Sequence, residues 1–218
     1  MNYTVHDTPW PHGHSESFID NDIALQMFQQ FPEWTDAWPT EFKNEYGYKK
    51  EWSEIYNLPD VIQKFIHKVY ADDFVAQLSE TFNIPLTVDW NLYGAGLNIF
   101  PPGSHLHKHI DFNYNNDLKK YRAVNLLYFL NDDWMEGDGG CFELYDQNKK
   151  LIKSIEPRLN HCVIFATNNN TTHGVSTTQN AFYRKSINLW YYTNKPTCLL
   201  YTSPSPRDLS TSRMPSSA

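Results

Sequence analysis

From residue 86 onward the chain consists of short runs of β-branched and aromatic residues separated by turn sequences. Turn signals such as Pro101-Pro102-Gly103 and Gly137-Asp138-Gly139-Gly140 divide the runs. About eight strands at such short spacing indicate a barrel or a double-sheet jelly roll, that is, a double-stranded β-helix. The predicted strands are Leu86–Leu92, Gly96–Phe100, Leu106–Phe112, Ala123–Leu130, Cys141–Tyr145, Ile152–Ile155, Cys162–Ala166 and Arg184–Tyr192.

The first 85 residues have a different texture, which we interpret as mostly helical. Apolar residues recur at helical spacing after Asp20 or Asn21, and a second stripe runs from Asp60 to Phe82. Residues 33–56 lie between them and are expected to be irregular. We therefore predict a mainly β protein with N-terminal helices, in which residues 1–85 form a support region packed on the barrel and residues 86–197 form the jelly-roll domain.

The last residues break abruptly from the strand-like text before them. Residues 198–218 resemble a translated sequencing adapter followed by its primer, and we expect a non-native, disordered tail. The alternative is a natural disordered tail, because the segment is rich in Ser and Pro.

The overall composition narrows the classes of partner. The net charge is −7 and no basic run occurs, so a surface that follows nucleic-acid phosphates is not expected. No apolar stretch approaches the roughly 20 residues of a membrane span, so no membrane partner is expected. The start of the chain lacks the features of a secretory signal. We interpret Cys141, Cys162 and Cys198 as reduced residues of a cytoplasmic protein. The sequence does not indicate an oligomeric state.

Three residues have the types and order of an iron site. His109 and Asp111 are two apart in a predicted strand, so both side chains emerge on one face. His173 must arrive from a later strand, which a folded-over barrel permits. Two imidazoles and one carboxylate on one side of a metal leave positions open for substrates, as in non-haem Fe(II) oxygenases. A His-x-Asp triplet alone is weak support, because it arises often by chance.

Other histidines offer a rival set of ligands. His105 and His107 share the predicted strand face of His109, so a pairing of His107 with His109 is an alternative. We favour His109 with Asp111, because His173 and Arg184 then follow at suitable distances, and we expect His107 to line the pocket or form hydrogen bonds. The remaining candidates, His12, His14, His67 and His161, are expected to be solvated or structural.

Arg184 opens the last predicted strand, eleven residues after His173. Alternation places Arg184, Ser186 and Asn188 on one face of that strand and Lys185 on the other. A guanidinium is a planar fork for a carboxylate, and neighbouring hydroxyl or amide groups can complete the clamp. The alternative is an arginine at a strand start that faces water.

An ordered series of motifs resembles a known family. The motifs are His109-Ile110-Asp111-Phe112-Asn113, the run from Tyr121 to Trp134, Gly139-Gly140, Ile155-Glu156-Pro157-Arg158, His173-Gly174 and Arg184-Lys185-Ser186. Together they are similar to the catalytic domain of prolyl 4-hydroxylase-like Fe(II)/2-oxoglutarate-dependent oxygenases, most closely the short bacterial and phage forms. The resemblance covers residues from about 86 to 193.

The resemblance implies roles for individual residues. His109, Asp111 and His173 would be the catalytic, iron-binding residues, and Arg184 would pair with the distal carboxylate of 2-oxoglutarate. Asn125, Ser186 and Asn188 are further candidates for the cosubstrate pocket. Phe100 and Phe129 are departures, since some prolyl hydroxylases carry tyrosine there, and Tyr128 is expected to point to the opposite face.

The implied reaction is an oxidative decarboxylation coupled to hydroxylation. The cofactors would be Fe(2+), 2-oxoglutarate and O2, with L-ascorbate as reductant, and the products would include succinate and CO2. The leading substrate is a prolyl residue of a peptide or protein. The alternatives are an oxygenase acting on a small metabolite or nucleobase, and a metal-binding jelly roll without turnover. Substrate choice would depend on loops such as Phe112–Lys120 and residues 33–56.

Overall fold

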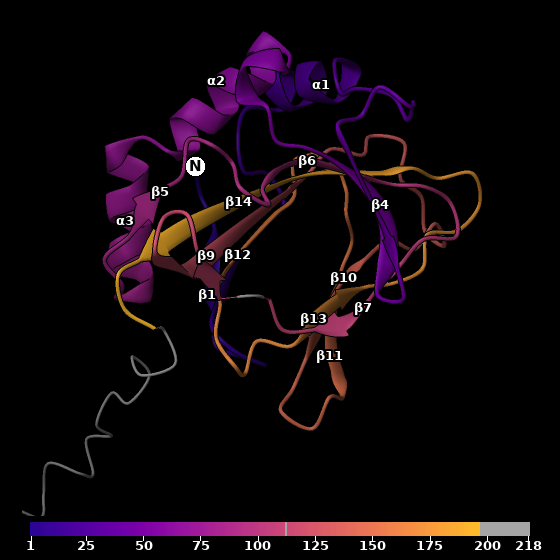
Figure 1. The fold of residues 1–218 in the computed structure, drawn as a ribbon. Helices are drawn as coiled ribbons and strands as arrows, with labels where there is room; N and C mark the ends of the chain where they lie inside the picture. Colours follow the sequence, from indigo (N-terminus) through magenta and orange to yellow (C-terminus); the bar gives the residue numbers. More distant parts are fainter. Residues whose placement is uncertain (112, 197–218) are drawn as a thin grey trace, which may run out of the picture.

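A curled antiparallel sheet organises the fold (Figure 1). The computed structural model describes residues 1–111 and 113–196. The strands are β1 (Thr4–His6), β2 (His12–Ser15), β3 (Thr40–Asn44), β4 (Gly47–Trp52), β5 (Thr87–Val88), β6 (Gly96–Phe100), β7 (Leu106–His109), β8 (Tyr114–Asn115), β9 (Lys120–Phe129), β10 (Phe142–Tyr145), β11 (Leu151–Ile155), β12 (Cys162–Ala166), β13 (His173–Val175) and β14 (Arg184–Thr193).

The strand order explains how distant parts of the chain meet. It runs β1-β2-β12-β9-β14-β6-β4-β7-β13-β10-β11, while β3, β5 and β8 pair with β4, β14 and β9. The sheet curls so that β7, β13, β10 and β11 lie opposite β9, β12 and β14 (Figure 1). This is the predicted jelly-roll architecture, with two facing layers around one interior.

Three α-helices cover the outside of the sheet: α1 (Asn21–Gln29), α2 (Asp60–Val69) and α3 (Asp72–Phe82), together with a short 3-10 helix, η1 (Ile55–Asn57). The carboxylate of Asp20 accepts hydrogen bonds from the first backbone amides of α1 and so caps the helix. The predicted helix from residue 60 to 82 is instead two helices. Asp72 and Asp73 lie in the first turn of α3, where negative charge favours a new helix start.

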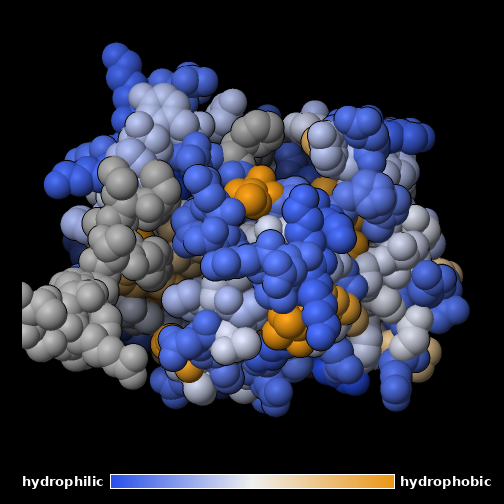
Figure 2. Space-filling model, turned by 90° about the horizontal axis from the view of Figure 1, so that it is seen from below, coloured by the Kyte–Doolittle hydropathy of each residue, from blue (hydrophilic) through white to orange (hydrophobic). Residues whose placement is uncertain are grey.

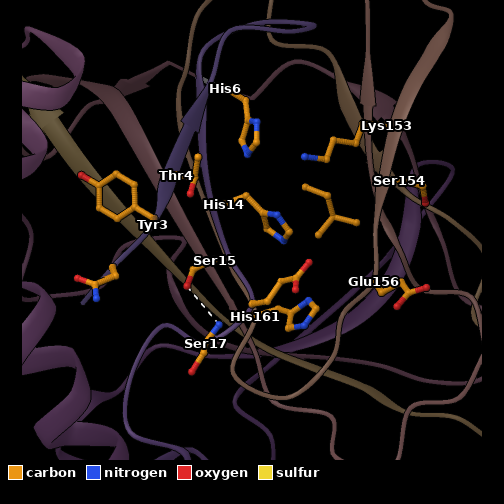
Figure 3. A pocket seen from close by; sticks show the side chains of 13 residues that line it. Tyr3, Thr4, His6, His14, Ser15, Ser17, Lys153, Ser154, Glu156 and His161 are labelled. Carbon is orange, nitrogen blue, oxygen red and sulfur yellow. Dashed lines mark hydrogen bonds between the residues drawn. The ribbon is translucent and has the colours of Figure 1, made fainter.

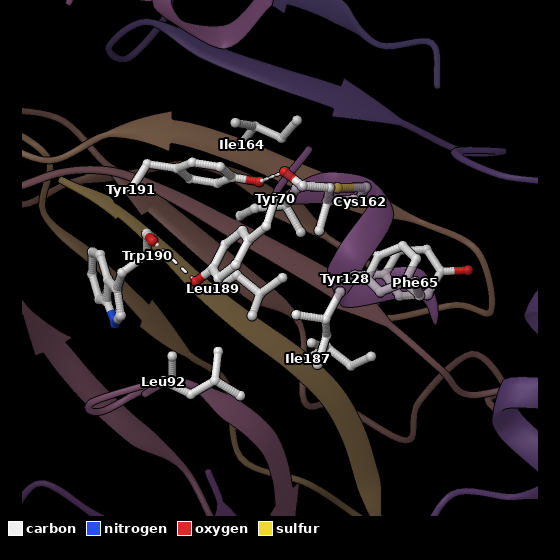
Figure 4. Close-up of a cluster of buried hydrophobic side chains, with 14 of the residues drawn as sticks. Phe65, Tyr70, Leu92, Tyr128, Cys162, Ile164, Ile187, Leu189, Trp190 and Tyr191 are labelled. Atoms are coloured by element: carbon white, nitrogen blue, oxygen red, sulfur yellow. Dashed lines mark hydrogen bonds between the residues drawn. The ribbon is translucent and has the colours of Figure 1, made fainter. Parts of the chain in front are cut away.

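The main hydrophobic core lies between these helices and the sheet (Figure 4). Alternate residues of β9, β12 and β14 face the helices, among them Tyr128, Ile164 and Tyr191. The Tyr70 hydroxyl donates a hydrogen bond to the Trp190 carbonyl (3.1 Å), and the Tyr191 hydroxyl donates one to the Val69 carbonyl (2.7 Å). These bonds satisfy buried phenols and fix α2 against β14.

The other residues of the same strands face the interior of the jelly roll. A second, smaller core there consists of Trp10, Leu127, Phe129, Phe142, Leu144, Ile155, Val163 and Phe165. Alternation along each strand therefore supplies two cores, one outside and one inside the curled sheet.

The structure corrects the prediction for residues 1–85. This segment contains β1 to β4 in addition to the helices, and β2 and β4 pair directly with β12 and β6. Residues 33–56, predicted to be irregular, contain the β3–β4 hairpin. Its turn is stabilised by a hydrogen bond from the Tyr46 amide to the Asn44 side chain (2.8 Å). The division of the chain at residue 85 stays a prediction.

Several predicted strand bounds also differ from the structure. The strand expected at residues 86–92 is reduced to β5, and the one expected at residues 106–112 ends at His109. Strands β8 and β13 were not predicted, because two or three residues are too few to produce a visible alternation. The predicted tail and Cys198 lie outside the described residues.

Two surface findings bear on partners. No helix among the described residues combines the length and apolarity that crossing a bilayer requires. On the face seen in Figure 2, hydrophilic side chains dominate and hydrophobic groups form only small, separate patches outside the grey atoms.

A histidine cluster lies where the N-terminal strands join the sheet. His6, His14 and Lys153 point toward one cavity of about 720 Å³ (Figure 3). The His14 ring lies 5.9 Å from that of His161, and the His6 ring lies 5.2 Å from that of His12. Burial, together with the charges of Lys153 and the neighbouring histidines, lowers the pKa of His14 to about 4. Burial also lowers the pKa of His12 and His161.

This cluster predicts a loss of stability in mild acid. Because the folded pKa of His14 lies below its unfolded value, the unfolded chain binds more protons as the pH falls from about 6.5 toward 4. The upper limit of the effect is about 3 kcal/mol, and water around the partly exposed ring reduces it. Urea unfolding at about pH 7 and about pH 5 should show that the free energy of unfolding falls less in His14→Gln than in the wild type. His67→Gln, which changes an exposed histidine on α2, is the control. An equal loss in all three proteins would contradict the prediction.

Candidate metal centre

Three side chains converge at the end of β7. His109 is the last residue of β7, Asp111 follows two residues later, and His173 opens β13, where it pairs in register with His109. The Nε2 atoms of His109 and His173 lie 3.4 and 3.3 Å from the two Asp111 carboxylate oxygens. One ligand atom from each residue lies within 4.8 Å of the others. The convergence predicted from the sequence is therefore present.

Backbone carbonyls hold both rings in the orientation that a metal requires. The Nδ1 of His109 lies 2.8 Å from the His107 carbonyl, and that of His173 lies 2.9 Å from the Thr171 carbonyl. A carbonyl only accepts hydrogen bonds, so each Nδ1 carries a proton and Nε2 is the nitrogen left to bind a metal at the shared point. Such second contacts orient the ligands of metal sites.

Burial and charge act in opposite directions at the three ligands. Burial alone would raise the pKa of Asp111, but the adjacent imidazoles of His173 and His109 outweigh it and the pKa is lowered. Burial lowers the pKa of His173, which keeps its ring neutral. Burial also opposes the charge on His109, but its hydrogen bond and charge interaction with Asp111 raise the pKa. The site thus holds a carboxylate and at least one neutral imidazole.

His107, the rival ligand for a pairing with His109, points away from the metal centre. His107 is exposed, and its Nε2 lies 3.2 Å from that of His105. Neither residue lines the cavity that contains His109 and Asp111. His107 therefore forms the hydrogen bond that was one of the two predictions for it, and the prediction that it lines the pocket is wrong.

Arg184 lies on β14 with its guanidinium inside the jelly roll. The side chain is 1% exposed, so the alternative of an arginine facing water is wrong. Its Nε donates to the Gly140 carbonyl (2.6 Å), its Nη1 donates to Ser186 Oγ (3.2 Å), and its Cζ lies about 5 Å from the Phe100 and Phe129 ring centres. Burial lowers the pKa of Arg184 to about 9, so the group stays charged at neutral pH.

Arg184 has one buried donor without a partner among the described residues. Its Nη2 is inaccessible to solvent and donates to no described neighbour within hydrogen-bonding distance. A buried charged donor left in this state is costly, whereas a carboxylate would satisfy it. Gly140 allows the close approach, because it has a φ of +67° and a Cβ there would lie 3.0 Å from Arg184 Cδ.

One cavity of about 670 Å³ contains the three ligands and Arg184. It is also lined by Asn125, Ser186 and Asn188, as predicted, and the Asn125 amide donates to the Asn188 side chain (2.6 Å). Phe100 lines the cavity, whereas Tyr128 points into the outer core, where its hydroxyl bonds Asn160. The predicted set of residues therefore faces one space.

The sequence did not indicate three further polar residues of this cavity. Lys49 comes from β4, Asn98 from β6 and Arg122 from β9. Arg122 stacks on Trp190, with its Cζ 4.4 Å from the ring centre, and its Nε has no partner in the part of the chain that the structure describes. Arg122 belongs to a motif that the family resemblance contained, but no pattern assigned it a role. Nothing in the sequence distinguished Lys49 from the other lysines.

The donor set fits Fe(II). Two imidazole nitrogens and one carboxylate oxygen are the ligands of a facial site that leaves positions open for other ligands. The unpartnered Nη2 of Arg184 in the same cavity fits the far carboxylate of a dicarboxylic cosubstrate. The residues present thus suit both an iron ion and 2-oxoglutarate.

Residues 95–192 match the model of the 2OG-Fe(II) oxygenase superfamily. This stretch, a little under half of the chain, is similar to a 2OG-Fe(II) oxygenase domain. A hypoxia-inducible factor prolyl hydroxylase of Caenorhabditis elegans is 31% identical over 99 residues. That match covers 44% of this chain and only 13% of the relative.

Solved structures support the same fold. A prolyl-4-hydroxylase from Pseudomonas putida has a TM-score of 0.63 at 15% identity, covering 84% of this chain and 92% of that one. A prolyl hydroxylase from Trichoplax adhaerens, in complex with a peptide fragment of the hypoxia inducible factor oxygen degradation domain, has a TM-score of 0.61 at 19% identity, with 85% of each chain covered. These likenesses confirm the predicted double-stranded β-helix of prolyl 4-hydroxylase-like oxygenases.

The geometry predicts which side chains are needed for metal binding. Asp111→Ala and His173→Ala each remove one of three ligands, so Mn(II) affinity measured by calorimetry should fall by roughly 100-fold or more. His107→Ala leaves the backbone carbonyl in place and should bind Mn(II) like the wild type. Loss of binding in His107→Ala, with affinity retained in Asp111→Ala, would support the rival pairing of His107 with His109 instead.

Proposed function

We propose that this protein hydroxylates a C–H bond, in a prolyl residue of a peptide or protein, using Fe(II), 2-oxoglutarate and O2 and releasing succinate and CO2. The observation that carries the proposal is the presence of the three ligands and the buried Arg184 in one cavity. A metal site without turnover has no need of a buried guanidinium with an unpartnered donor. The proposal therefore favours an enzyme over a structural metal site.

Each residue has a physical task in this proposal. Iron, when bound, supplies the activation of O2 that an unactivated C–H bond requires. The Nε2 atoms of His109 and His173 and the Asp111 carboxylate fix its position. Arg184 donates through Nη2 to the distal carboxylate, which orients the cosubstrate before reaction. Asn125, Ser186 and Asn188 offer further polar contacts in the pocket.

The cavity mouth suits an extended chain with an apolar ring. Tyr46 and Ile110 line the cavity and are 52% and 45% exposed. Apolar side chains at an entrance can contact a proline ring, while the unpartnered Nε of Arg122 can donate to a carbonyl of the substrate. The prolyl hydroxylases among the similar proteins support this choice of substrate. A small metabolite remains the second candidate, because a cavity of about 670 Å³ could admit one.

Two finer points belong to the same proposal. We expect L-ascorbate to sustain turnover by re-reducing iron that has been oxidised without substrate, as the family resemblance implies. We also propose a reducing compartment, the cytoplasm, because Cys141 and Cys162 are both free thiols among the described residues.

Succinate formation is the direct test of the cosubstrate chemistry. Purified protein with Fe(II), 2-oxoglutarate and O2 should form succinate slowly, even without a substrate, and Asp111→Ala should form none. Arg184→Met should raise the 2-oxoglutarate concentration for half-maximal rate roughly 100-fold, because it removes a buried charge-assisted contact. Arg158→Met changes an exposed arginine paired with Glu156 and is the matched control. The absence of succinate under all conditions would favour a metal-binding jelly roll without turnover.

Mass spectrometry then tests the substrate. Proline-containing peptides should gain one oxygen atom in the presence of all cofactors, and the modified residue should be proline. Modification of a small metabolite or a nucleobase with unmodified peptides would select the alternative substrate class.

A further inference from the structure

Lys49 is a cation in the same cavity that the proposed function leaves unused. It lies on β4, its side chain is 15% exposed, and it lines the same cavity as Arg184 and the metal ligands. Its Nζ lies 2.5 Å from Glu51 Oε1 and 2.8 Å from Asn98 Oδ1. These contacts hold the ammonium on the inner face of the sheet rather than in solvent.

The strand register places Lys49 at the Arg184 end of the cavity. Phe100 of β6 pairs with Arg184 of β14, and Lys49 and Arg184 both lie over its ring, with Nζ 5.9 Å and Cζ 5.1 Å from the ring centre. Asn98, which accepts from Lys49, pairs in register with Ser186, which accepts from Arg184. Lys49 is thus bonded to β6, the strand that pairs with β14, and β14 carries Arg184.

The ammonium of Lys49 has a donor to spare. An ammonium carries three N–H donors, and Glu51 and Asn98 account for two of them among the described residues. The third is left beside the ring faces of Phe42 and Phe100, which are weak partners at 5.7 and 5.9 Å from their centres. A carboxylate in the cavity would be a stronger partner.

The neighbouring lysine, Lys50, has a purely structural role and serves as a comparison. Lys50 points to the other face of β4, where its ammonium donates to the Thr35 carbonyl (2.7 Å) and lies 4.6 Å from the Trp34 ring centre. Its ammonium fixes the segment before the hairpin, and Lys50 does not line the cavity of the metal centre. Lys49 connects only cavity-lining residues, and a largely buried ion pair in such a place contributes little net stability.

We propose that Lys49 is a second cationic contact for the distal carboxylate of 2-oxoglutarate, beside Arg184. It would thereby select a dicarboxylic over a monocarboxylic 2-oxo acid. This inference rests on the proposed function, because it assigns a further residue to the same cosubstrate. Glu51 and Asn98 hold the ammonium in place before the cosubstrate binds, so little side-chain entropy is lost on binding.

Binding of two 2-oxo acids without turnover tests the inference. Protein loaded with Mn(II) in the absence of O2 is titrated by calorimetry with 2-oxoglutarate and with 2-oxopentanoate, which has the same chain length without the distal carboxylate. Lys49→Met should weaken the binding of 2-oxoglutarate about tenfold, or about 1.4 kcal/mol, and leave the binding of 2-oxopentanoate unchanged. Lys49→Met/Glu51→Gln should give the same result without an unpaired carboxylate. Lys43→Met, at an exposed position of the same hairpin, should match the wild type.

The outcomes separate this inference from the proposed function. Wild-type affinity for 2-oxoglutarate in the double variant would overturn the role of Lys49 and leave the proposed function intact. Equally weakened binding of both acids would also overturn the role of Lys49, because the effect would then be structural or act at the keto end of the acid. A wild-type protein that binds Mn(II) but not 2-oxoglutarate would overturn the proposed function and this inference together.

Discussion

The pairing of β13 with β7 is the constraint on which the candidate site depends. His109 and His173 come from strands 64 positions apart in the chain, and their rings share one point only because these two residues are in register. A slip of one residue would turn His173 to the other face of the sheet. Contacts of the His173 ring with Phe142 and Phe165, at 5.3 and 5.0 Å between centres, oppose such a slip. The interior core therefore also positions the ligands.

Burial of Arg184 lowers the stability of the fold at a position that the proposed function requires. Its desolvated guanidinium and unpartnered Nη2 cost free energy, on the order of a few kcal/mol for a charged donor. The contacts with the Gly140 carbonyl, Ser186 and two aromatic rings offset part of this cost. The outer core beneath the helices supplies stability independent of the cavity. A rigid cation with an unpartnered donor can bind a carboxylate strongly and in a fixed orientation.

Local sequence patterns predicted the parts of the molecule in which periodicity is clear. The bounds of β6 and β12 agree with prediction, and alternation along β14 correctly placed Arg184, Ser186 and Asn188 inside. The meeting of His173 with His109 is a long-range fact that spacing alone could not establish, and the order of family motifs supplied it. The β3–β4 hairpin was missed because its many charged residues have the composition of a loop. Lys49 was missed with it, since its place in the cavity depends on pairing between β4 and β6.

The chemistry of the site depends on one metal ion between two imidazoles and one carboxylate. Crystals grown with Fe(II) and without O2, measured on both sides of the iron absorption edge, would locate the ion directly. We expect a single strong anomalous peak within coordinating distance, about 2.0–2.2 Å, of Nε2 of His109, Nε2 of His173 and an oxygen of Asp111. A peak at His105 and His107, or one that one of the three predicted ligands does not reach, would contradict it.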